Sequence, residues 1–193
     1  GGSGNINTVA ITSGTLTTLN GNITTDNSSG NSVTLVGTTT NGANISIDTN
    51  NTSNDGAISI AAFSSSNNNL VLDSGGADIN LSGAAFNLGS GSLTTTGDIN
   101  LAANVSITAT GGITINDKID ADDASSNDRT LTLNSGTGST MTFSDAIGGT
   151  EALAGLTITQ SNGATFGSTL DITDGSAGTL TVTDTENGSD IIF

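Results

Sequence analysis

The feature that most constrains the fold is a two-residue alternation of apolar and polar residues, found in short segments along most of the chain. This period places aliphatic side chains on one face of a β-strand and Thr, Ser or Asn on the other. No long stretch has the apolar period of a helix, so we expect an all-β fold. The alternation is clearest in residues 44–48, 57–60, 105–108, 113–115, 131–133, 156–159, 170–172 and 180–183.

Some of these segments repeat at a regular spacing. The Asp-Ile-Asn-Leu sequence of residues 78–81 returns at residues 98–101, and Ile99 is followed by Ile119 at the same offset. Asn-Gly, Asp-Gly and Gly-Gly pairs separate the segments, as expected for tight turns. This repeat of about 20 residues corresponds to one turn of a β-solenoid, or to two hairpin arms of an antiparallel array.

Each expected strand is very short and contributes one or two buried side chains. Stacking equivalent turns about 4.8 Å apart lets every apolar side chain contact its equivalents above and below. We therefore predict one right-handed parallel β-solenoid (β-helix) segment over residues 1–193, with about 20 residues per turn. About nine turns would form a rod on the order of 45 Å long. An immunoglobulin-like sandwich is the alternative, although the longer strands and core Trp or Tyr of that fold are missing.

The composition excludes several functions. The chain has no Cys, His, Trp or Tyr, and Lys118 and Arg129 are its only cations. Without His or Cys it forms no Ser-His-Asp triad, thiol nucleophile or ordinary zinc site. Carboxylate pairs hydrolyse glycosides in some β-helices, but the aromatic sugar platforms and basic residues of such enzymes are absent. We therefore expect no enzymatic activity.

The charge balance limits the partners. With two cations the chain is a poor ligand for nucleic acid, whose phosphates are held mainly by Lys and Arg. A formal net charge of −16 favours solubility and the uptake of divalent cations. No apolar run approaches the roughly 18 residues of a membrane helix, so we expect no membrane insertion.

Charge is concentrated in one expected loop at about residues 116–129, which holds both cations. Calcium takes roughly six to eight oxygen ligands, and several carboxylates on one loop can supply them. The spacing matches neither an EF-hand nor the glycine-rich calcium-binding nonapeptide, and a solvated loop with internal ion pairs is the alternative. Calcium is the one cofactor that this loop suggests, and the candidate ligands are Asp117, Asp120, Asp122, Asp123 and Asp128.

Two further features break the regular pattern. Asp184, Glu186 and Asp190 form a second acidic group near the C-terminus, suited to binding a cation or repelling a neighbouring molecule. Between Ile147 and Leu156 the spacing is longer than a simple turn, so we expect a small lateral excursion there.

The repeats resemble those of a known class of proteins. The segments Ile147-Gly148-Gly149, 153–158 and 163–167 resemble the β-strand repeats of giant bacterial surface proteins. The Gly-Asp-Ile-Asn-Leu and Gly-Gly-Ile-Thr-Ile sequences resemble filamentous-haemagglutinin-type adhesin repeats. The resemblance covers most of residues 76–183. It implies a right-handed parallel β-helix that is exported to the cell surface for adhesion, aggregation or matrix building, and it transfers no catalytic residue.

These observations favour a structural component of an extracellular or cell-surface filament. The chain begins Gly1-Gly2-Ser3-Gly4 and ends in an apolar run at residues 190–193, so neither end has the polar cap that stops solenoids from stacking. We expect either self-association into a filament or a segment cut from a longer rod. An adhesin rod that binds a host or neighbouring-cell surface is the alternative, and a surface-layer lattice subunit is a third hypothesis.

Overall fold

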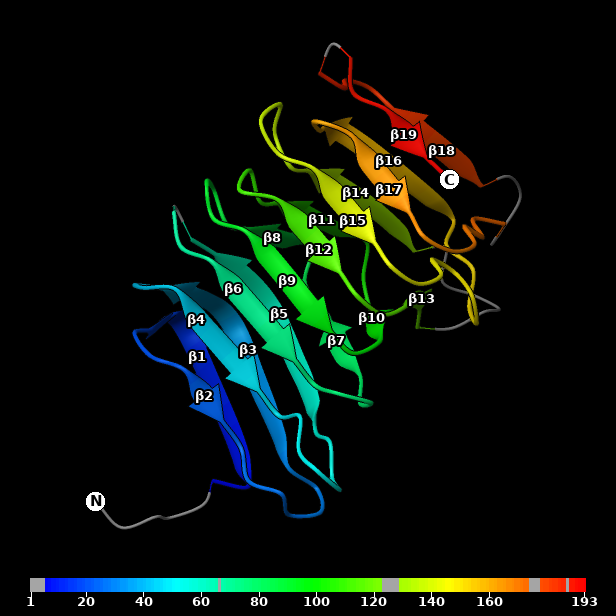
Figure 1. The fold of residues 1–193 in the computed structure, drawn as a ribbon. Helices are drawn as coiled ribbons and strands as arrows, with labels where there is room; N and C mark the ends of the chain where they lie inside the picture. The colour runs from blue at the N-terminus through cyan, green and yellow to red at the C-terminus, as the bar shows by residue number, and fades with distance from the viewer. Residues whose placement is uncertain (1–5, 66, 123–128, 174–177, 187) are drawn as a thin grey trace.

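The chain folds into a β-solenoid of about seven turns, with successive turns about 24 residues apart. The computed structural model describes residues 6–65, 67–122, 129–173, 178–186 and 188–193, and these contain no helix. Figure 1 shows the turns stacked in chain order from the N-terminus to the C-terminus. Every strand pair in the described residues is parallel, which confirms the predicted solenoid and excludes the sandwich.

The strands form two sheets that enclose the core. The eight-stranded sheet consists of β2 Ile23–Thr24, β4 Ile45–Asp48, β6 Leu70–Asp73, β9 Leu93–Thr96, β12 Ile113–Ile115, β15 Met141–Phe143, β17 Ala164–Phe166 and β19 Ile191–Ile192. The eleven-stranded sheet consists of β1 Thr8–Leu19, β3 Ser32–Asn41, β5 Ala57–Ser64, β7 Ile79–Leu81, β8 Ala85–Asn87, β10 Ile99–Leu101, β11 Val105–Thr108, β13 Ile119–Ala121, β14 Thr130–Asn134, β16 Gly155–Gln160 and β18 Thr179–Val182.

The core consists of columns of side chains that run along the stack. At each step a residue pairs with its equivalent in the next turn, so aliphatic and aromatic groups pack in register about 4.8 Å apart. One column starts in β1 and contains Val9, Val33, Ile58, Ile79, Ile99, Ile119, Ile147 and Leu170. Another starts in β2 and contains Ile23, Ile47, Leu72, Thr95, Ile115, Phe143 and Phe166.

The turn length predicted from the repeats holds only in the middle of the chain. Ile79, Ile99 and Ile119 are paired at the predicted offset, as are Leu93 and Ile113. Elsewhere the corners are longer, and the next partner of Ile113 is Met141, well beyond the predicted offset. The chain therefore makes about seven turns instead of the nine that we predicted.

The cross-section changes from two walls to three at β5. The first half of β5 pairs with β7 and its second half with β8, so one long strand is followed by two short ones at an angle. Gly83 lies at the new corner, directly over Ala61. A Cβ atom on Gly83 would lie 1.3 Å from the Ala61 carbonyl oxygen, so no larger residue fits there. The corner thus depends on the missing side chain.

The expected loop at residues 116–129 is only partly a loop. Ile119–Ala121 form β13, with Ile119 and Ala121 buried and Asp120 pointing outward, because the alternation continues through the acidic stretch. Residues 123–128 lie outside the described part. The expected excursion after Ile147 is present: Ile147 makes single bridges to Ile119 and Leu170, and the chain returns to the sheet at Gly155.

The described part of the chain holds no helix with the length and apolar character needed to traverse a lipid bilayer.

The column arrangement predicts unequal effects for two adjacent residues of β11. Ile107 is buried between Phe86 and Leu133, whereas Ser106 points outward and is exposed. We expect Ile107→Ala to lower the free energy of unfolding by about 2–5 kcal/mol, since it leaves a cavity in a packed column. Ser106→Ala should change it by less than about 0.5 kcal/mol. Equilibrium urea unfolding measures both, and equal effects would contradict the assigned register.

Candidate assembly edges and acidic residues

The N-terminal end of the solenoid is an uncovered edge in the described residues. β1 pairs with β3 and β2 pairs with β4, and no described strand lies on their other sides. Val9 and Ile11 are therefore only partly buried, whereas Val33, the partner of Val9, is completely buried. An edge strand of this kind presents a row of unpaired backbone N–H and C=O groups.

The C-terminal end shows the same incomplete burial. Val182 in β18 is 39% exposed, although its partner Ile158 is completely buried. Phe193 is 69% exposed, and its ring stacks on Phe166 with ring centroids 4.9 Å apart. Phe166 in turn stacks on Phe143 at 5.0 Å. These near-parallel rings extend the column that starts at Ile23, so the same core column is uncovered at both ends.

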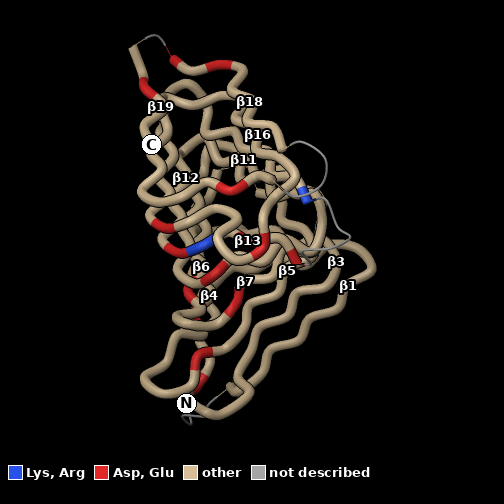
Figure 2. The backbone as a smooth tube through the Cα atoms, turned by 90° about the vertical axis from the view of Figure 1, so that its right-hand side faces the viewer, with Lys and Arg blue, Asp and Glu red and all other residues tan. Residues whose placement is uncertain are grey.

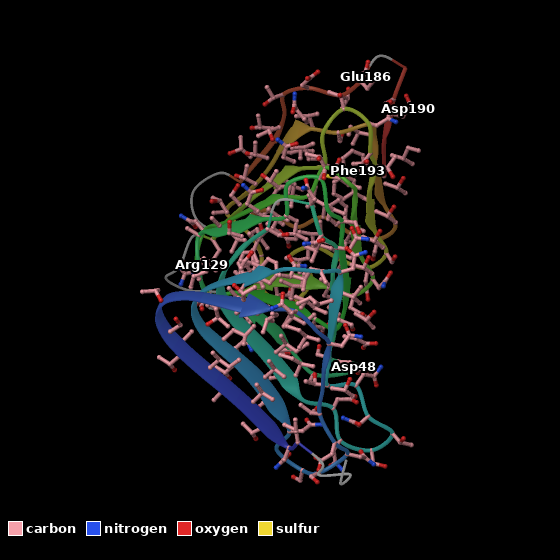
Figure 3. All side chains as sticks on the ribbon, turned by 90° about the vertical axis from the view of Figure 1, so that its left-hand side faces the viewer. Asp48, Arg129, Glu186, Asp190 and Phe193 are labelled. Carbon is pink, nitrogen blue, oxygen red and sulfur yellow. The ribbon has the colours of Figure 1, made fainter. Side chains whose placement is uncertain are left out.

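Acidic residues lie at both ends of the stack. β1 and β3 contain no charged residue, as Figure 2 shows for the long strands at the N-terminal end. The C-terminal end carries the second predicted acidic group, and Figure 3 shows Glu186 and Asp190 at the end of the stack away from Asp48. Asp184 Oδ2 accepts a hydrogen bond of 3.4 Å from the Gln160 side chain. At the N-terminal end the acidic residues are Asp26, which follows β2, and Asp48, the last residue of β4.

The predicted calcium ligands that the structure describes bind protein groups. The Gly97 amide donates to Asp117 Oδ2 over 2.8 Å, and the Thr150 amide donates to Asp120 Oδ1 over 2.9 Å. Asp122 receives two hydrogen bonds from the Arg129 guanidinium, from Nε at 2.8 Å and from the terminal nitrogen at 2.9 Å. This pair raises the pKa of Arg129 through the hydrogen bonds to Asp122.

The structure does not bring these carboxylates together as a metal site among the residues it describes. No group of three or more acidic side chains there has metal-binding geometry. Asp123 and Asp128 lie outside the described residues, so the full set of five ligands stays a prediction. Lys118 lies 3.9 Å from Asp98 Oδ2, a weak and exposed ion pair that was not expected from the sequence.

Sequence reasoning missed the structural use of Asn. Asn22, Asn44 and Asn69 each precede a strand of the smaller sheet, and each side-chain oxygen accepts a hydrogen bond from a backbone amide of the next turn. The donors are Ser46, Asn69 and Ser92, at distances of 2.9 to 3.0 Å. The detectable signal was Asn directly before Ile or Leu at the start of three successive strands. These bonds satisfy backbone amides at or just before the beginning of a strand.

The carboxylate of Asp55 also accepts hydrogen bonds from backbone amides, as the Asn side chains do. Its two oxygens accept hydrogen bonds from the Asn51 amide at 3.0 Å and from the Gly76 amide, in the next turn, at 2.8 Å. The hydrogen bonds from Asn51 and then Gly76 lower the pKa of Asp55 below 3.8. Because the folded pKa is lowered, the stabilisation is present above about pH 3.8 and is lost as the pH falls through the folded value.

This assignment predicts a pH-dependent effect of Asp55→Asn. At pH 7 the variant should be less stable than the parent, because a neutral amide accepts hydrogen bonds less strongly than a carboxylate. The difference should shrink as the pH falls below 3.8 and through the lowered folded pKa of Asp55, where the carboxylate takes up a proton. Denaturant unfolding at several pH values measures this. Asp78→Asn is the matched control, since it removes an equal charge from an exposed side chain, and a similar loss in both variants would contradict the role of the hydrogen bonds.

No family model, curated protein or solved structure matches this chain.

Proposed function

We propose that this chain is a structural segment of an extracellular or cell-surface filament, in which β-solenoid turns stack end to end. The observation that carries the proposal is the pair of open edges in the described part of the chain, at which the side chains of the core columns are only partly buried. A column of aliphatic and aromatic side chains gains stability from each added turn, because every turn buries the surface of the one before it.

The core columns that reach the C-terminal edge are the same columns that begin at the N-terminal edge. If a second solenoid follows along the same axis, its β1 and β2 take the places next to β18 and β19. Phe193 then faces the Ile23 position of the next segment, and Leu170 faces Val9, because each pair belongs to one column. Such a head-to-tail contact does not close on itself and therefore produces a linear polymer. The next turn can equally be supplied by further sequence of a longer rod, with the same structural result.

The composition supports an extracellular location. Trypsin-like proteases cleave after Lys or Arg, and the chain offers only Lys118 and Arg129. The net charge of −16 keeps separate rods soluble and apart. The resemblance to surface-protein repeats leads to the same proposal. A rod of this kind needs no catalytic residue, and we propose a non-enzymatic role.

Electron microscopy of the purified chain tests the proposal. We expect unbranched filaments with an axial repeat of about 4.8 Å in diffraction. Their growth should increase from low salt to about 0.15 M salt, because screening weakens repulsion between acidic rods. Repeating the experiment with calcium and with a chelator shows whether the five predicted Asp ligands contribute.

A charge placed on the open edge should stop assembly. Phe193→Asp puts a carboxylate on the exposed end of the aromatic column, and we expect short particles with an unchanged circular dichroism spectrum. Ser106→Asp adds the same charge to the lateral surface and should leave the filaments intact. Discrete particles from the unmodified chain at every concentration and salt level would overturn the proposal.

A further inference from the structure

The chain contains four Asn-Gly pairs, and the structure leaves one of them exposed at the N-terminal edge of the stack. Asn before Gly is chemically labile, because Gly has no side chain to keep its backbone nitrogen away from the Asn carboxamide. A folded chain reacts only where these two groups are free to meet. The pairs in the described residues are Asn20-Gly21, Asn41-Gly42 and Asn162-Gly163, whereas residue 187 of the fourth pair lies outside them.

The pair at Asn20 is unconstrained in the described structure. Asn20 is exposed, its side chain makes no hydrogen bond to a described residue, and the Gly21 backbone N–H donates none. A Cβ atom on Gly21 would meet no atom within 4 Å, so the space around the pair is open to water. The Asn20 carboxamide lies against the bare backbone of Gly42, where a Cβ atom would come within 2.1 Å of its Oδ1. Both reacting groups are therefore unbonded and accessible.

The other two described pairs are held by the fold. Asn41 is 4% exposed, and its Nδ2 donates to the Asn69 carbonyl over 3.0 Å. The Gly42 amide also donates to a backbone carbonyl, over 2.9 Å, so both reacting groups of this pair are occupied. Asn162 is partly buried, and its Oδ1 accepts a hydrogen bond from the Ser189 hydroxyl. Each of these pairs must open locally before it can react.

We propose that Asn20 is a site of spontaneous deamidation. The Gly21 backbone nitrogen loses its proton to hydroxide or water and attacks Cγ of Asn20. The new C–N bond closes a succinimide ring, and the Nδ2 group takes up a proton and leaves as ammonia. Water then breaks one of the two C–N bonds of the ring. Cleavage at Cγ leaves an aspartate at position 20, and cleavage at the main-chain carbonyl leaves an isoaspartate. One water is consumed and one ammonia is released, so the step needs no other reactant.

The reacting pair lies where another rod would attach. Asn20 follows Leu19, which begins a row of residues linked from turn to turn by strand pairing and backbone hydrogen bonds. The row ends at Thr185, which is followed by Glu186. Its members are Leu19, Asn41, Ser65, Leu88, Ala109, Ser135, Ser161 and Thr185. Figure 1 shows β1 and β2 at the end of the stack away from β18 and β19. In a head-to-tail stack, Asn20 of one rod therefore lies beside Glu186 of the rod before it.

This placement makes the reaction a limit on filament growth, an inference that rests on the proposed function. Deamidation puts a carboxylate at position 20, and like charges that face each other on neighbouring strands are destabilising. An isoaspartate also adds a carbon atom to the main chain at the corner before β2. A rod that has reacted should no longer accept a neighbour at this edge. Inside a filament the neighbouring rod covers Asn20 and should slow its reaction.

Peptide mapping of the full chain, aged at neutral pH, tests the site. Cleavage before Asp residues places the three pairs on separate peptides, 1–25, 26–47 and 145–170, for mass spectrometry. We expect Asn20 to react at least about tenfold faster than Asn41 or Asn162, because those two require local opening. In concentrated urea the three rates should become similar, since each Asn then has the same following residue and no fold to hold it. Equal rates in the folded chain would overturn the proposal.

Two variants confirm the chemistry. Gly21→Ala adds a methyl group in open space at a φ that is not positive, so the fold should persist. The methyl group hinders the attacking nitrogen, and we expect the reaction at Asn20 to slow at least about fivefold. Asn20→Gln moves the carboxamide one methylene away, so no succinimide forms and no product should appear at position 20. An unchanged rate in Gly21→Ala would contradict attack by the Gly21 nitrogen.

Filament growth is measured separately, by sedimentation and electron microscopy. Asn20→Asp reproduces the aspartate product and should lower the sedimented fraction at least about tenfold with an unchanged circular dichroism spectrum. Ser106→Asp, with the same charge on the lateral surface, and Asn20→Gln should assemble like the parent chain. Equal assembly of Asn20→Asp and Ser106→Asp would overturn the block on growth. If the parent chain forms no filaments, the filament proposal and the block fail together, whereas the peptide map still decides the reaction at Asn20.

Discussion

The contact between successive turns is the interaction on which the rest of this structure depends. Parallel strands about 4.8 Å apart exchange backbone hydrogen bonds and place equivalent side chains directly above one another. A strand such as Ile79–Leu81 has only two inward side chains and is not stable alone. Between β5 and β10 both side chains become completely or almost completely buried. Stability therefore comes from neighbouring turns, as in other repeat proteins, and a turn at either end lacks half of its contacts.

The polar residues complete this arrangement at the corners, where the chain leaves one wall and enters the next. Strand hydrogen bonds end there, and the free amides need other acceptors. Asn22, Asn44 and Asn69 supply them from one turn to the next, and Asp55 and Asp117 do so as carboxylates. The acidic composition thus has a structural use, since Asp117 and Asp120, two of the predicted calcium ligands, bind backbone amides.

The fold and the site differ in how far they could be predicted. The alternation of Val105, Ile107 and similar residues predicted strand positions well, because a period of two has one structural meaning. The length of a turn was harder, because the repeat of the Asp-Ile-Asn-Leu segments covers only the short corners. The position of Asp120 illustrates the same limit: charge suggested a loop, but the buried Ile119 and Ala121 on either side keep it in a strand.

The sequence by itself determined that the chain is all-β, that its strands are short, and that it lacks the residues for most catalytic chemistry. These properties follow from local periodicity and composition, which need no knowledge of distant contacts. Only the tertiary structure decided which turns are in register and where two walls become three at Gly83. Those properties depend on the number of residues in each corner, which differs from turn to turn and which the local alternation of the strands does not set.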